Sequence, residues 1–230
     1  MLSIISIAMQ SVILIVGDLV FVIAKGVGLM HIEGEGVCID ANGNRHSIAG
    51  IGGLPESGKY RKLKVSGNIT FKNISAIEVK LEGDSRGESI KADELSAEGI
   101  FKVNEVSIIN RFELSGTPNI GCLTARSVDI ESRDGFIKKT RCEHVKIYHH
   151  DSHGGGILGR VFGYSTSKKI CVTIGEIEAN DVDLQNCQVD EIRCENATIG
   201  TNCVIKLLIV KGNCDIASEA KVDEVIRKII

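Results

Sequence analysis

Apolar residues recur along this chain in two columns, with a period of about 16–17 residues. The first column contains Leu63, Val79, Leu95, Phe112, Val128 and Val145, and the second contains Val65, Leu81, Ala97, Leu114, Ile130 and Ile147. Polar residues fill most intervening positions, so the alternation predicts strands with one buried face. A fixed period of this length is typical of a β-solenoid. We therefore expect an all-β fold, a single-stranded β-helix with turns of about 16–17 residues.

Two columns of small residues repeat at the same period, and the glycine column predicts the corners of the coils. Glycines follow the apolar pairs, at Gly67, Gly83, Gly99 and Gly116. Glycine is favoured where the chain bends with a positive φ, so we expect that conformation here. The other column contains Ala76, Ala92, Ala125, Cys142, Ala179 and Cys194. Cysteine acts there as a small buried apolar residue.

The repeat also predicts how the chain is divided. Residues 30–59 contain many turn residues and have no sustained period, so we expect a linker. The β-helix should span residues 60–230, with an irregular insertion at about 149–173. The pattern resumes with Ile177–Leu184 after the insertion. Residues 220–229 are predicted to form either a last strand or a short capping helix.

Residues 1–29 are nearly all apolar, with Gln10 and Asp18 as the main interruptions. An apolar run of this length is a candidate membrane helix, although Asp18 is costly in lipid. No Lys or Arg precedes the run, unlike in a secretory signal. The β-branched run at Val12–Val16 instead suits a packed strand. Three alternatives stay open: a membrane anchor, a packed strand or helix, and a gene-prediction extension ahead of a start at Met30.

The composition limits which binding partners and which cellular compartment are expected for this protein. The net charge is −3 and the isoelectric point is about 6.1, so nucleic acid is not an expected partner. The chain has 8 cysteines, and no two of them form a C-x-x-C pair. Because some cysteines replace alanine in a predicted core column, we expect free thiols and a reducing cytoplasm.

A group of histidines is the strongest candidate for metal chemistry. His144, His149, His150 and His153 lie close to Cys142 and Asp151. Imidazole and thiolate are preferred zinc ligands. However, the spacing matches no helix-borne zinc motif, and most of the group falls in the predicted insertion, where ligands are poorly fixed. We predict a solvated loop and no metal site, and keep a metal-dependent enzyme as an alternative.

Other enzymatic patterns are incomplete. Gly154–Gly156 lacks the Lys-Ser/Thr ending of a phosphate-binding loop, and the chain has no G-x-S-x-G motif. Left-handed β-helix acyltransferases repeat a hexapeptide, of which Ile199–Val204 gives one unit, but the glycines here recur once per turn. The sequence therefore predicts no catalytic residue, no cofactor and no small-molecule substrate, with an acyltransferase-type β-helix as an alternative.

The turns from Leu63–Ile69 through Phe112–Gly116 to Val128–Ile130 resemble those of bactofilins, the polymer-forming cytoskeletal proteins of bacteria. The order of later segments is similar to a branch found in clostridia and bacilli: Ile177–Leu184, Cys187–Val189, Ala197–Cys203 and Val222–Val225. The resemblance covers about residues 60–229. It implies a right-handed β-helix that polymerises end to end without nucleotide and often associates with membranes. The long apolar N-terminus and the insertion depart from the family pattern.

A β-helix leaves backbone groups and apolar side chains uncovered at its two ends, and stacking of a second rod covers them. The predicted contacts between copies are Leu63, Val65, Ile69 and Phe71 at the N-terminal end and Val222, Val225 and Ile226 at the C-terminal end. We expect a structural homopolymer in the cytoplasm, at the inner face of the cell membrane through residues 1–29. The alternative is a membrane-tethered scaffold with capped ends that binds a partner through the insertion.

Overall fold

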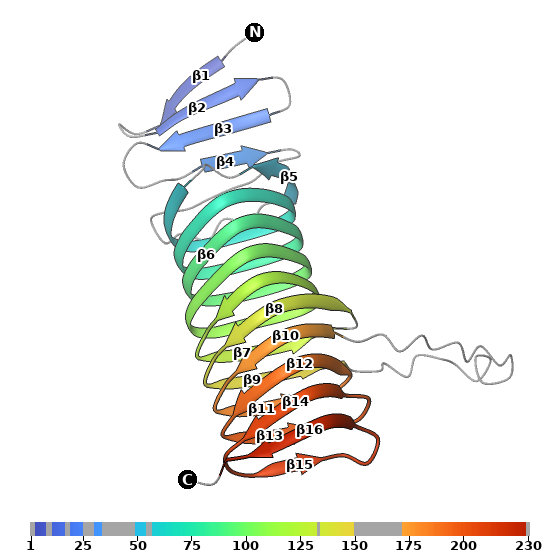
Figure 1. The fold of residues 1–230 in the computed structure, drawn as a ribbon. Helices are drawn as coiled ribbons and strands as arrows, with labels where there is room; N and C mark the ends of the chain where they lie inside the picture. Colours follow the sequence, from blue (N-terminus) through green and yellow to red (C-terminus); the bar gives the residue numbers. More distant parts are fainter. Residues whose placement is uncertain are drawn as a thin grey trace, which may run out of the picture.

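The computed structural model is a β-solenoid, and the residues it describes contain no helix (Figure 1). It describes residues 3–7, 11–16, 19–24, 30–33, 49–53, 57–132, 134–149 and 172–228, with side chains from residue 62 onward except that of Ser66. The predicted fold class is confirmed.

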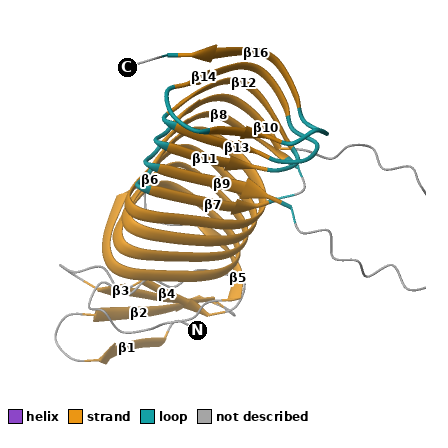
Figure 2. Ribbon diagram, turned by 90° about the horizontal axis from the view of Figure 1, so that it is seen from below, coloured by secondary structure: helices purple, strands orange, loops and turns teal. Residues whose placement is uncertain are grey.

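The solenoid strands pair in parallel in one sheet, ordered β15-β13-β11-β9-β7-β6-β8-β10-β12-β14-β16, and β5 also pairs with β6. Beyond the end of β6 the coils alternate between two series of strands, the odd-numbered and the even-numbered (Figure 2). The strands are β5 (Ala49–Gly53), β6 (Ser57–Thr124), β7 (Ser127–Glu131), β8 (Gly135–Arg141), β9 (His144–Tyr148), β10 (Val172–Glu178), β11 (Asp181–Leu184), β12 (Cys187–Cys194), β13 (Asn196–Ile199), β14 (Val204–Val210), β15 (Cys214–Ile216) and β16 (Lys221–Arg227).

The register stacks the predicted columns on one another. Phe112 pairs with Val128, and Val128 pairs with Val145, so each coil advances the chain by one predicted period. All twelve residues of the two apolar columns are at most 5% exposed. The step between coils varies, since Ile177 pairs with Ile192 at a step of 15 and Leu208 pairs with Val225 at a step of 17. The core is therefore a stack of inward side chains with a repeat slightly more variable than predicted.

The corner glycines have the predicted backbone conformation, with φ between 106° and 148° at Gly67, Gly83, Gly99 and Gly116. The coils also approach closely there, since a Cβ on Gly99 would lie 2.5 Å from the carbonyl oxygen of Gly83. Near the C-terminus the same role passes to Asn186 and Asn202, with φ of 55° and 57°. The Asn202 amide donates a 3.1 Å hydrogen bond to Asn186 Oδ1, which links these corners.

The apolar N-terminal segment forms strands where it is described. Strands β1 (Ser3–Ile7), β2 (Ser11–Val16), β3 (Leu19–Ala24) and β4 (Met30–Glu33) pair as a separate antiparallel sheet in chain order. The β-branched run Val12–Val16 lies in β2, and the three alternatives for residues 1–29 stay predictions. No helix among the described residues is long and apolar enough to cross a bilayer.

The parallel ladder begins before the predicted start of the β-helix. Strand β5 lies inside the predicted linker, and its residues Ala49–Gly53 pair with Ser66–Thr70 of β6. The sequence Ala-Gly-Ile-Gly-Gly has no alternation of apolar and polar side chains, so a pattern search misses it. Backbone pairing to an existing coil is sufficient to recruit such a strand.

The predicted insertion interrupts the chain without interrupting the stack. Strand β9 ends at Tyr148 and β10 begins at Val172, while Ile137 pairs directly with Ile174. This step is 37, which is 20 more than the 17 that separate Ile120 from Ile137. Residues 150–171, including His150, Asp151 and His153, lie outside the described residues.

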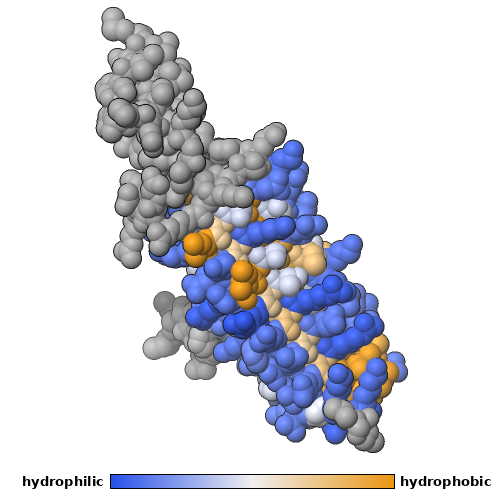
Figure 3. Space-filling view, turned by 90° about the vertical axis from the view of Figure 1, so that its left-hand side faces the viewer, coloured by the Kyte–Doolittle hydropathy of each residue, from blue (hydrophilic) through white to orange (hydrophobic). Residues whose placement is uncertain are grey.

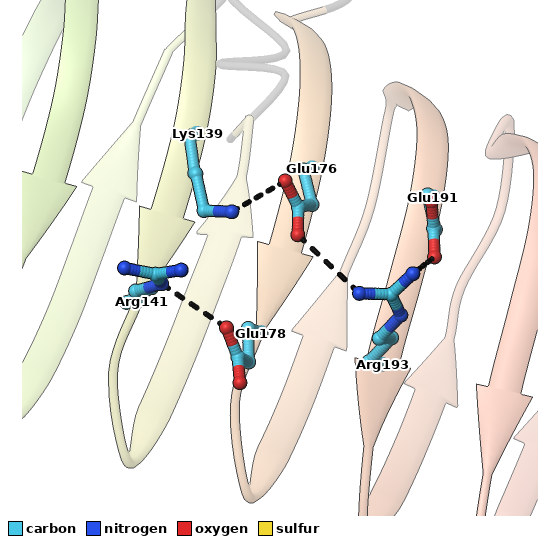
Figure 4. Close-up of polar contacts among 6 residues, drawn as sticks. All are labelled: Lys139, Arg141, Glu176, Glu178, Glu191 and Arg193. Carbon is cyan, nitrogen blue, oxygen red and sulfur yellow. Dashed lines mark hydrogen bonds and ion pairs between the residues drawn. The ribbon is translucent and has the colours of Figure 1, made fainter.

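Ion pairs bridge the coils on either side of the insertion (Figure 4). Lys139 Nζ lies 2.6 Å from Glu176, and Arg141 lies 3.1 Å from Glu178. Glu176 also lies 3.7 Å from Arg193. The hydrogen bond from Lys139 lowers the pKa of Glu176, so this carboxylate stays charged next to its partner. Each exposed pair contributes little alone, but the series favours the observed register.

Candidate functional site: the open C-terminal coil

The solenoid ends in two edge strands, β15 and β16. They occupy the two ends of the strand order in the parallel sheet, and each pairs with one described strand, β13 and β14 respectively. The other backbone edge of β16, over seven residues, faces no strand among those described. Unpaired backbone groups in such an edge are a template for pairing with another chain.

Inward-pointing apolar side chains of this last coil are uncovered. Val225 pairs with Leu208, yet Val225 is 41% exposed whereas Leu208 is fully buried. Ile216 pairs with Ile199 and is 36% exposed. The difference arises because each inner residue is covered by the next coil, and no described coil follows the last one. Figure 3 shows apolar surface at the C-terminal end of the rod.

Ile226 extends this apolar surface onto the outer face of the rod. It pairs with Ile209 of β14 and is 38% exposed. Val222 pairs with Ile205 and is half-buried, packed against the core. The three residues predicted at this end thus lie together on β16, two of them exposed. We call Ile216, Val222, Val225 and Ile226 the end patch.

A charged residue also occupies an inward column at this end. Arg227 pairs with Val210, and Val210 pairs with Cys194 of the small-residue column. Burial raises the pKa of the Cys214 thiol, and the positive charge of Arg227 opposes that rise. An inward-pointing charge on an edge strand opposes the stacking of another apolar coil. The positive charge of Arg227 therefore follows the apolar end patch directly in the sequence of β16.

The residues predicted as contacts at the N-terminal end lie in the core. Leu63, Val65, Ile69 and Phe71 are 0–4% exposed. Ile69 pairs with Gly52 of β5, so this coil is followed outward by another strand. Contact with a second copy through these side chains requires displacement of what covers them, and their role at an interface stays a prediction.

The histidine group is only partly described, and that part carries no metal site. His144 Nδ1 lies 2.8 Å from Asp181 on the outer face of the rod. Among the described residues, no group of three His, Cys, Asp or Glu side chains converges to hold a metal ion. The Cys142 thiol lies in the small-residue column, and burial raises its pKa to about 12.

A shallow groove of about 550 Å³ follows the face formed by the odd-numbered strands β7 to β15. Its floor is the buried column at Val128, Val145 and Val182, and outward carboxylates such as Asp129 and Asp183 flank it. The groove is the gap between two rows of outward side chains. Ser127, His144 and Asp181 line it on three successive coils, and His144 Nδ1 lies 2.8 Å from Asp181.

Sequence analysis missed two residues of the end, Ile216 and Arg227. A signal existed for Ile216, because Cys214-Asp215-Ile216 repeats the pattern of Ala197-Thr198-Ile199 one period earlier. Arg227 is found by the same count from Val210. A pattern of apolar residues does not mark Arg227, because this position of the inward column carries a charge.

Comparisons of the chain with models of protein families, with curated proteins and with solved structures found no match. The bactofilin resemblance therefore stays a prediction.

Proposed function

We propose that this protein is a structural scaffold of the bactofilin type that assembles with copies of itself, without nucleotide, through its C-terminal coil. The observation that carries the proposal is the set of uncovered apolar side chains on the inward columns of β16 and β15. A second copy is the favoured occupant because successive coils pair in register and share one cross-section. A coil of the same outline matches the shape of this end.

The energetic basis is the hydrophobic effect together with backbone pairing. Covering the exposed parts of Val225, Ile226 and Ile216 removes apolar surface from water, at roughly 25 cal/mol per Å². Pairing the free edge of β16 adds backbone hydrogen bonds over up to seven residues. The resemblance adds the expectation of filaments, of a cytoplasmic location at the inner face of the membrane, and of lipid contact through residues 1–29.

Full-length protein without nucleotide should form filaments or short oligomers in negative-stain electron microscopy, and its sedimentation coefficient should rise with concentration. Val225→Arg places a charge on the end patch, so we expect the dissociation constant for self-association to rise at least about tenfold. The matched control is Ile77→Arg, which adds the same charge at a 53% exposed isoleucine of β6, far from this end.

Two outcomes contradict the proposal. One is a strict monomer at the highest soluble concentration, and the other is self-association that Val225→Arg leaves unchanged.

A second candidate function rests on Arg227. If its charge caps the end, the protein is a scaffold that does not polymerise. Arg227→Val then restores the apolar column and should convert a monomer into an associating species by sedimentation. Under the first proposal the wild type already associates, and this substitution strengthens the association.

A further inference from the structure

Two buried thiols are stacked in adjacent coils near the C-terminal end. Cys187 begins β12, and Cys203 immediately precedes β14. The register pairs Gln188 with Val204, so the residues just before them, Cys187 and Cys203, are neighbours across the ladder. Each cysteine also follows an asparagine in the left-handed conformation, Asn186 or Asn202, so the two corners turn alike.

The two side chains point into the same part of the interior. Cys187 is fully buried and Cys203 is 1% exposed. Cys187 Sγ lies 3.2 Å from the carbonyl oxygen of Gln185, and Cys203 Sγ lies 3.4 Å from that of Leu184, the preceding residue. A side-chain hydrogen bond with Cys187 is the main cause that lowers the pKa of Cys203. The register and the shared burial place the two thiols side by side in the interior.

This spacing suits a disulfide. Paired residues of neighbouring strands lie about 4.8 Å apart, and the Cα atoms of a disulfide are usually about 4.4–6.8 Å apart. None of the other described cysteines pairs with a cysteine of a neighbouring coil in the register of the ladder. Cys122 pairs with Lys139, Cys142 is followed by Ala179, Cys194 by Val210, and Cys214 pairs with Ala197. Cys187 and Cys203 are thus the stacked pair within the described residues.

We propose that Cys187 and Cys203 form a redox-sensitive pair whose disulfide staples the β12 and β14 coils directly behind the open end. With diamide as the oxidant, two S–H bonds break and one S–S bond forms. The two protons and two electrons reduce the N=N bond of diamide to a hydrazine. Because both thiols are buried, the oxidant reaches them when the last coil, β16, opens.

The test treats the reduced full-length protein with diamide, alkylates the remaining thiols in denaturant, and identifies linked peptides by mass spectrometry. Combined cleavage after Glu, Lys and Arg places Cys187, Cys194 and Cys203 on separate peptides. We expect a Cys187–Cys203 linkage and the loss of two of the 8 alkylatable thiols. The thermal midpoint should rise by about 5–10 °C, because the bond closes a loop of about 17 residues.

Cys203→Ala should abolish both the loss of two thiols and the rise in midpoint. The matched control Cys194→Ala, also a buried cysteine, should retain both. The proposal is overturned if the linked peptides join other cysteines, if no intramolecular link forms, or if Cys203→Ala loses two thiols at the wild-type rate. The disulfide-linked peptides identified in the wild-type protein test the proposal even if a variant folds poorly.

Discussion

Among the described residues of its inward column, Thr140 alone has a hydroxyl. It lies between Leu123 and Ile177, is fully buried, and its Oγ1 has no hydrogen-bond partner within the described part of the chain. A buried unsatisfied hydroxyl costs about 1–3 kcal/mol, whereas an apolar group of the same shape does not. The Thr140 hydroxyl therefore destabilises the solenoid locally, close to the insertion.

Thr140→Val keeps the side-chain shape and removes the unsatisfied group. We expect it to raise the free energy of unfolding by about 1 kcal/mol, measured by urea denaturation. Thr124→Val, at an exposed position of β6, is the control and should change stability by less than about 0.5 kcal/mol. A destabilised Thr140→Val protein would mean that the hydroxyl does have a partner.

Gly99 combines a positive φ of 106° with close contact to the coil below. Gly99→Ala forces a Cβ to within 2.5 Å of the Gly83 carbonyl oxygen, so the two coils must separate. We expect a loss of about 2–3 kcal/mol in the free energy of unfolding. Glu98→Ala, at the exposed neighbour, should cost far less, and equal losses in the two variants would contradict this account.

At the scale of the element, each coil is one unit that stacks on its neighbours. The insertion shows that the coils stack independently of the chain length between them. Strands β8 and β10 pair in register although their paired residues are 37 positions apart in the sequence. Ion pairs such as Lys139–Glu176 join the same coils. The alternation of apolar residues predicted that the stack resumes at Ile177–Leu184, whereas β10 already begins at Val172, within the predicted insertion.

Deletion of residues 150–169 shortens the step between Ile137 and Ile174 from 37 to 17, which equals the step between Ile120 and Ile137. We expect the shortened protein to fold with an unchanged β-sheet circular dichroism spectrum and a thermal midpoint within about 3 °C of the wild type, since loop length weakly affects stability. Loss of cooperative unfolding would show instead that the segment packs on the rod.

At the scale of the whole molecule, the sequence predicted the coils better than the ends. A coil is specified by local alternation, so Leu63, Phe112 and Val145 were placed correctly in the core. An end is a coil that has no further coil on one side. The local pattern of apolar and polar residues does not show whether another coil follows. The N-terminal contacts were therefore placed on a buried coil, while β5, with three glycines in five residues, had no apolar signature.

The direction of the ladder has a mechanical consequence. Hydrogen bonds between coils run along the rod, so tension applied between its ends acts on one coil at a time. The rod should lengthen in steps, each releasing a coil of about 16 residues and roughly 50 Å of chain. Strand β6, 68 residues without a break, would extend as several such steps. The force needed to extend such a rod is therefore set by the pairing of a single coil, and the length of the rod sets only how far it can extend.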